Sequence, residues 1–280
     1  MSSAPRATVR HALIPCGGRG TRMRALSGSA PKELLPVAGV SLVEWVAREC
    51  AASGASELLV VTAPGKDAIR ERLAPHTGSP GFPVRIEFVE QRTPAGLMDA
   101  VRLGRDFAGH APLAVALPDN LFVGDAPGMA QVIETYYRTG KNVVAVVEVL
   151  AADAARRGAT GTYAGALAHG DEFGLTAIRA KDPRAATFDT GGAPSAFTGV
   201  GRYVFTDEVW DVIETVARML PPGAELDDVP VLQRLLAGSR LVGRRMRGQF
   251  LDVGLPSGYE EATRIIRRPP RPSAPTGELA

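Results

Sequence analysis

The sequence has 280 residues, which is enough for one large domain, and its 45% hydrophobic content supports a sizeable core. A formal net charge of +2 gives no global positive field for nucleic acid, and no apolar run is long enough for a membrane span. The N-terminal apolar run is too short for a signal peptide, and two cysteines are too few for a disulfide framework. We therefore expect a soluble, cytoplasmic protein.

Apolar runs alternate with helical patterns through the first 150 residues. The runs predict strands at 11–15, 56–63, 84–91, 112–120 and 142–149. The helical patterns cover 41–54, 65–74, 96–109 and 128–140. This repeated alternation predicts an α/β fold, a Rossmann-like mixed and mainly parallel sheet flanked by helices.

The pattern changes after residue 149. Short alternating stretches with turn glycines predict β-hairpins at 161–181, added to the main sheet. A strand at 197–206 and a helix at 207–220 follow, and residues 241–266 read as strand, turn and helix. No linker divides the chain, so one domain is predicted over 1–268. The proline-rich, basic end at 269–280 is expected to be a disordered tail.

A glycine-rich, basic loop follows the first predicted strand in the stretch IPCGGRGTRMRALSGSAPKELLPV. Its three glycines, Gly17, Gly18 and Gly20, fall at the sheet edge where α/β folds bind ligands. Glycine lets backbone N–H groups approach phosphate oxygens, and the nearby Arg22 and Lys32 add charged donors. The loop therefore indicates a phosphate site.

Two common phosphate loops do not fit this segment. A Walker loop needs lysine and then serine or threonine after its last glycine, but Thr21 and Arg22 stand there. A dinucleotide fingerprint needs a third glycine where Met23 stands. From the glycines alone, a surface loop without a ligand stays open as an interpretation.

The continuation of the loop resembles a known family. Thr21-Arg22 followed by SAPKELLPV is similar to the signature of sugar-1-phosphate nucleotidylyltransferases. The stretches FVEQRTPAGLMDAV, LPDN, GVGRYVF and FLDVGLPSGYEEA resemble later parts of the same family, so the likeness runs from about His11 to Ile266. The details PKELLPV, VTAPGKDAI and GRYVF look most like the bacterial UTP–glucose-1-phosphate uridylyltransferases.

The resemblance implies a reaction and a set of residues for it. The reaction is transfer of a nucleotidyl group from UTP to glucose 1-phosphate with Mg²⁺, and a homo-oligomer is expected. Arg22 and Lys32 are the implied catalytic cations, and Asp119 and Asp252 the implied metal ligands. The implied nucleotide-binding residues are Cys16, Gly17, Gly18, Gly20, Thr21, Gln91 and Gly96. The nucleotide-binding part would cover about 9–150, and the sugar-binding part about 151–268.

The sugar-binding part departs from the family pattern. The implied sugar-phosphate residues are Lys181, Gly165 and Asp182, but Ala180 stands where the family has glutamate. Loss of that carboxylate leaves two alternatives open. One is the same chemistry with another nucleoside triphosphate or sugar 1-phosphate, such as dTTP or mannose 1-phosphate. The other is a non-catalytic relative that binds nucleotide sugars; a Rossmann oxidoreductase is a more distant alternative, because the fingerprint fails.

Overall fold

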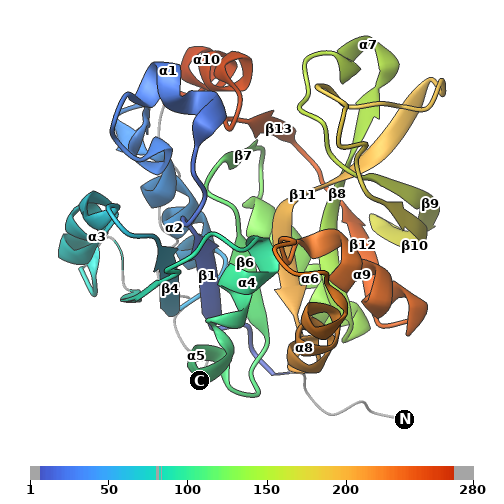
Figure 1. The fold of residues 1–280 in the computed structure, drawn as a ribbon, viewed down its shortest axis with the longest axis horizontal. Helices are drawn as coiled ribbons and strands as arrows, with labels where there is room; N and C mark the ends of the chain where they lie inside the picture. Colours follow the sequence, from blue (N-terminus) through green and yellow to red (C-terminus); the bar gives the residue numbers. More distant parts are fainter. Residues whose placement is uncertain (1–6, 80–81, 83, 268–280) are drawn as a thin grey trace.

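The computed structural model describes residues 7–79, 82 and 84–267 (Figure 1). The tail predicted at 269–280 lies outside the described residues. The central feature of the structure is a nine-stranded sheet in the order β5-β4-β1-β6-β11-β8-β12-β10-β9. In that order the strands are Arg85–Glu90, Glu57–Thr62, His11–Pro15, Leu113–Ala116, Ser195–Phe205, Asn142–Leu150, Leu241–Arg245, Glu172–Arg179 and Thr162–His169. The predicted α/β class is confirmed.

The sheet is parallel in two blocks joined by one long antiparallel strand. β5, β4, β1 and β6 run parallel, as do β8 and β12, while β11 is antiparallel to both β6 and β8. The hairpin of β9 and β10 continues the sheet at its far edge, as the turn glycines predicted. Two further strand pairs stand outside the sheet: β2 (Pro36–Val37) with β3 (Val40–Ser41), and β7 (Asn120–Val123) with β13 (Gln249–Asp252).

Helices cover both faces of the sheet. Along β1, Ala12 and Ile14 pack into one apolar core while Leu13 packs into the other, which is why this strand is apolar throughout. The first core lies under α2 (Leu42–Ala52), α3 (Asp67–Leu73), α6 (Gly128–Thr139) and α10 (Pro256–Ile265). The second lies under α4 (Leu97–Arg102), α5 (Arg105–Ala108), α8 (Val209–Met219) and α9 (Asp228–Ala237). The short helices α1 (Arg24–Ser27) and α7 (Ala151–Ala154) lie near the top of the view in Figure 1.

Several elements differ from the sequence-based predictions, among them α9, which falls in a stretch for which no element was predicted. The helix expected at 96–109 is interrupted between α4 and α5 at Gly104, where a Cβ would lie 2.8 Å from Leu13 Cδ1. The segment 241–266 holds two strands, β12 and β13, before its helix. The second of them pairs with β7, and in Figure 1 this ribbon lies between the part carrying α1 and the part carrying α7. Among the described residues no helix is both long and apolar enough to cross a membrane.

Candidate active site

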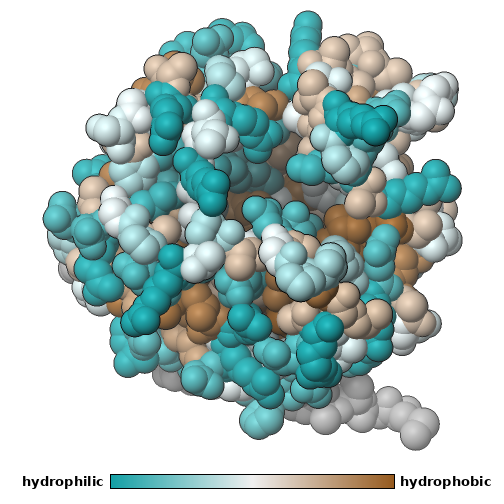
Figure 2. All heavy atoms as spheres, in the orientation of Figure 1, coloured by the Kyte–Doolittle hydropathy of each residue, from teal (hydrophilic) through white to brown (hydrophobic). Residues whose placement is uncertain are grey.

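A cleft of about 930 Å³ opens at the carboxyl ends of the parallel strands, and Figure 2 shows this face hollowed between the parts carrying α1 and α7. Residues that follow three strands line it: Gly17 after β1, Gln91 after β5 and Asp119 after β6. This is the edge at which open α/β sheets bind ligands. The predicted site residues that line the cleft are Gly17, Gly18, Thr21, Arg22, Lys32, Gln91, Gly96, Asp119, Lys181 and Asp252.

A larger residue at Gly17 would displace the Gln91 side chain. A Cβ at this position would lie 2.3 Å from Oε1 of Gln91, whose side chain is buried against the loop. The Gln91 amide nitrogen donates to the carbonyl of Gly96 (3.2 Å) and to a carboxylate oxygen of Asp99 (2.8 Å). Gly96 has a φ of 111°, a conformation that side chains disfavour. The two glycines and the glutamine therefore form one packed corner of the cleft.

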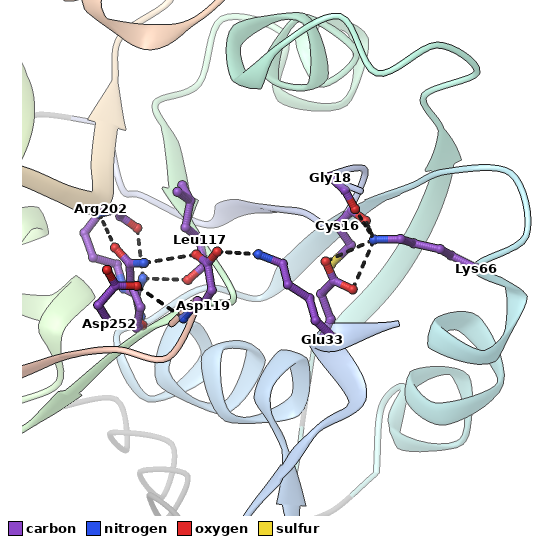
Figure 3. A network of polar contacts seen from close by, with 12 residues as sticks. Cys16, Gly18, Glu33, Lys66, Leu117, Asp119, Arg202 and Asp252 are labelled. Atoms are coloured by element: carbon purple, nitrogen blue, oxygen red, sulfur yellow. Dashed lines mark hydrogen bonds and ion pairs between the residues drawn. The ribbon is translucent and has the colours of Figure 1, made fainter. Parts of the chain in front are cut away.

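Lys66 binds the backbone of the glycine loop. Its ammonium donates to the carbonyls of Cys16 (2.6 Å) and Gly18 (2.7 Å) and forms an ion pair with buried Glu33 at 3.0 Å (Figure 3). One side chain thus ties three points of the first crossover together. No spacing rule singles out this lysine, and the sequence analysis assigned it no role.

Lys32 and Asp119 form an ion pair across the cleft. The lysine comes from the 3₁₀ turn η2 (Lys32–Leu34), and the aspartate from the turn between β6 and β7. Burial acts to raise the pKa of the Asp119 carboxyl, but the charge and hydrogen bond of Lys32, together with the charge of Arg22 and a backbone hydrogen bond, outweigh burial and lower that pKa. Burial likewise opposes the charge on Lys32, yet Asp119 raises the pKa of the lysine. Both groups therefore stay charged over the physiological pH range.

Asp252 meets Asp119 because β7 and β13 pair. The antiparallel register sets Asp252 opposite Asn120, one residue beyond Asp119. A Cβ at Gly254 would lie 3.0 Å from Oδ2 of Asp119 and 3.2 Å from Oδ1 of Asp252, so both carboxylates face the same small space (Figure 3). Burial raises the pKa of Asp252, and the charge of Asp119 raises it further, while Arg22 acts in the opposite direction.

The two carboxylates offer oxygen ligands at one point. Within the described ranges no group of three or more His, Cys, Asp and Glu side chains could hold a metal ion. A Mg²⁺ site commonly uses only one or two carboxylates and completes its shell with water and substrate phosphates. Asp119 and Asp252 fit that donor set.

A buried ion pair holds the turn that carries Asp119. Arg202 on β11 is fully buried and makes two contacts of 2.8 Å with the Glu49 carboxylate. The same guanidinium donates to the carbonyls of Leu117 (3.0 Å) and Asn120 (2.7 Å), on either side of Asp119 (Figure 3). Because these carbonyls are fixed, the aspartate between them is fixed as well. The sequence analysis noticed this strand but not its arginine.

Four predicted site residues lie outside the cleft lining. Gly165 stands on β9 with its Cβ position 2.3 Å from the Gly174 carbonyl, so strand packing explains this glycine. The exposed Asp182 accepts a hydrogen bond from the Arg184 backbone N–H at 2.8 Å.

The other two belong to the glycine loop. The Cys16 backbone N–H donates to the Val61 carbonyl and its own carbonyl accepts from Lys66, so both backbone groups already have a partner within the protein. Gly20 has a φ of 62° and lines a smaller cavity beside the cleft.

The far end of the cleft has acidic residues that sequence analysis did not assign. Glu225 and Asp227 line it, as does Asp228 at the start of α9. Asp228 accepts a hydrogen bond from the Tyr203 hydroxyl at 2.7 Å. Burial raises the pKa of the Asp228 carboxyl, and the hydrogen bond from Tyr203 partly offsets that rise. The stretch ELDDVP resembles a family segment and keeps Glu225, but it departs from the usual Leu-Thr-Asp and no role was predicted for its acidic residues.

A profile of known sequences described as nucleotidyl transferase matches residues 11–268. The chain belongs to the nucleotidyl transferase family. This confirms the family resemblance drawn from the sequence motifs. The matched range includes the glycine loop, both carboxylates and the acidic far end of the cleft.

Similar proteins agree with this family membership. The UTP–glucose-1-phosphate uridylyltransferases of Staphylococcus epidermidis and of Bacillus subtilis strain 168 are 26% and 27% identical to this nucleotidyl transferase over 273 residues. The alignments cover 91% of this chain, and 91% and 90% of the two relatives.

Solved structures match over a similar span. A UDP-glucose pyrophosphorylase complexed with UDP-glucose superposes with a TM-score of 0.78 at 22% identity, covering 92% of this chain and 98% of the other. A UTP-bound enzyme of the same name from Acinetobacter baumannii gives a TM-score of 0.74 at 25% identity, covering 91% and 92%. The fold of this nucleotidyl transferase is therefore that of the solved members.

Proposed function

We propose that this nucleotidyl transferase joins UTP and glucose 1-phosphate to give UDP-glucose and pyrophosphate. The names of the similar relatives and the titles of the similar structures support this pair of substrates. The observation that carries the proposal is a convergence in one cleft. Arg22 and Lys32 line the cleft from the first crossover, and Asp119 and Asp252 line it from two later segments.

The chemistry requires charge and alignment more than a base. An oxygen of glucose 1-phosphate, already an anion, attacks the α-phosphorus of UTP, and the bond from that phosphorus to the bridging oxygen breaks as pyrophosphate leaves. Two anions must therefore meet in line. In this proposal Lys32 donates to the α-phosphate and Arg22 to the departing pyrophosphate, and both residues line the cleft. The ion pair with Asp119 keeps Lys32 charged and restricts its position.

Mg²⁺ is the proposed cofactor, since Asp119 and Asp252 together present oxygen ligands to one small space. When bound there, the ion would supply positive charge to the phosphate oxygens. The two carboxylates need no third protein ligand, because substrate phosphates can complete the set.

The division of the cleft follows the same proposal. Residues of about 9–150 would bind the nucleotide, and Gly17, Gln91 and Gly96 would contact its nucleobase. Residues of about 151–268 would bind the sugar phosphate, and Lys181 would contact that phosphate. A location in the cytoplasm and assembly into a homo-oligomer stay predictions from the sequence.

The decisive experiment is a substrate panel with release of pyrophosphate as the readout. UTP, dTTP, ATP and GTP would each be paired with glucose 1-phosphate and mannose 1-phosphate, with Mg²⁺ and with EDTA. We expect the largest kcat/KM for UTP with glucose 1-phosphate and no turnover with EDTA. A different preferred pair would replace the proposed substrates, and UTP binding without turnover of any sugar phosphate would favour a non-catalytic relative.

A further inference from the structure

A segment outside the family motifs reaches the cleft beside Asp252. Residues 155–161 join α7 to β9, and Arg157 and Gly158 are among those that line the cleft. The backbone here is anchored, because the Arg157 carbonyl accepts the Phe188 N–H at 3.1 Å and Gly158 forms a bridge with Thr187. Arg157 is therefore held in place by its backbone and not only by its side chain.

The Arg157 side chain packs against β13, the strand that carries Asp252, one of the two proposed metal ligands. Its guanidinium carbon is 4.9 Å from the centre of the Phe250 ring, and two of its nitrogens are 3.5 Å from the Phe250 carbonyl. Phe250 and Asp252 are two residues apart on one strand, so their side chains share a face. The guanidinium on Phe250 thus adjoins the Asp252 carboxylate. In the described part of the chain, Arg157 forms no ion pair with a carboxylate within 4.0 Å.

Arg22 reaches the same corner from the opposite wall. A Cβ at Gly158 would lie 2.9 Å from Nη1 of Arg22 and 3.7 Å from Oδ2 of Asp252. The residue that follows Arg157 is thus in contact range of the other guanidinium. Two arginines from segments about 135 positions apart (Arg22 and Arg157) flank one corner of a cleft already proposed to bind polyphosphate. Their mutual repulsion is relieved when an anion with several oxygens lies between them.

We propose that Arg157 is a further phosphate-binding catalytic residue, which donates to the pyrophosphate part of the nucleotide together with Arg22. The proposal rests on the proposed function, because it takes the nucleotide to bind in this cleft. A guanidinium carries five N–H donors, so Arg157 can stack on the Phe250 ring, donate to its carbonyl and still present other N–H groups to phosphate oxygens.

The test uses inorganic pyrophosphate as the probe, so that it does not depend on the sugar. Its affinity for the full chain would be measured by calorimetry with Mg²⁺ for the wild type, Arg157→Gln, Arg157→Lys and Arg156→Gln. Arg156 is the matched control, since its side chain is 82% exposed and it does not line the cleft. We expect Arg157→Gln to weaken binding about 10- to 100-fold, as loss of a charge-assisted hydrogen bond does, and Arg157→Lys to weaken it less. Arg156→Gln should stay within about twofold of the wild type.

Several results would overturn the proposal. One is equal pyrophosphate affinity in Arg157→Gln and Arg156→Gln; another is a wild type that binds no pyrophosphate. A lower midpoint of thermal unfolding in Arg157→Gln with unchanged pyrophosphate affinity would mean that Arg157 stabilises the fold through its contact with Phe250 and does not bind phosphate. If Arg157→Gln does not fold, the same comparison is made with Arg157→Lys. Weaker pyrophosphate binding in the variant, with no turnover by the wild type, would keep this inference and remove the proposed substrates.

Discussion

The two ends of the cleft differ in how some of their charged side chains are held: beside the glycine loop, Lys66 and Arg202 each have several partners, whereas beside the β9–β10 hairpin Lys181 and Asp227 have none among the described residues. Lys66 contacts two carbonyls and a carboxylate, and Arg202 contacts a carboxylate and two carbonyls around Asp119. At the other end, no hydrogen bond or ion pair ties the side chain of Lys181 or Asp227 to another described residue.

This difference indicates how the two ends would contribute to catalysis. Groups held before substrate arrives lower the barrier without reorganisation, so changes at the glycine-loop end should act mainly on kcat. Exposed groups must be ordered when ligand binds, which reduces their net contribution. Changes at the hairpin end should therefore act mainly on KM for the sugar phosphate.

The carboxylate pair should give the largest effect. Asp252→Asn removes a charged metal ligand, and we expect kcat to fall about 10³-fold or more, since a bound metal supplies several kcal/mol of charge stabilisation. Asp119→Asn should act similarly. The measurement is pyrophosphate release at saturating Mg²⁺, and Asp125→Asn, an exposed aspartate just beyond β7, is the control. Normal turnover in Asp252→Asn would remove this residue from the metal site.

The buried ion pair should give the next largest effect, on stability. Among the described residues, Arg202→Met leaves the Glu49 carboxylate with the backbone N–H of Met129 as its one partner, and breaking a buried pair costs about 3–5 kcal/mol. The free energy of unfolding in urea would measure it. Arg85→Met is the control, because Arg85 is 65% exposed and its surface pairs should contribute less than about 1 kcal/mol. Equal losses in the free energy of unfolding for the two variants would contradict the prediction that the buried ion pair stabilises the fold more than the exposed ones.

Lys32 should come third. Lys32→Ala removes a preorganised charge, and the loss of one such donor typically lowers kcat about 10²- to 10³-fold. Steady-state kinetics with the preferred substrates would measure it, with Lys141→Ala as the control, because that lysine is exposed and outside the cleft. A kcat unchanged in Lys32→Ala would reduce Lys32 to a structural partner of Asp119.

The sequence was sufficient for the fold because its patterns are local. The apolar runs of β1, β4 and β8 and the helical spacing of α2 and α6 predicted the sheet and its helices. The β7–β13 ribbon was not predicted, since its two strands are four residues each and more than 120 residues apart. That ribbon brings Asp252 to Asp119, so the sequence could suggest the pair only through family resemblance.

The residues that were missed act through contacts across the fold rather than through spacing. Lys66 and Arg202 stand in stretches that resemble the family, VTAPGKDAI and GRYVF, but the resemblance gave these two residues no role, and Arg157 stands outside the motifs. Their importance comes from the carbonyls, carboxylates and rings they contact across the fold. Conversely, Gly165 and Asp182 were predicted from the family resemblance, in a part of the sequence where Ala180 departs from the family pattern. The structure gives both a local packing or turn role.

Lys181 should give the smallest effect and the sharpest test of the comparison between the two ends. Lys181→Ala removes an exposed cation, and we expect KM for glucose 1-phosphate to rise about 10-fold, which matches the lower end for a hydrogen bond to a charged group. KM for UTP and kcat should change little, because the glycine-loop end is intact. Steady-state kinetics with each substrate varied in turn would separate these constants. Asp182→Ala is the control, since its side chain bonds the Arg184 backbone instead of lining the cleft. If Asp182→Ala raised the sugar-phosphate KM as much as Lys181→Ala, the loop after β10 would have to rearrange when the sugar binds, and the hairpin end would be shaped by its ligand.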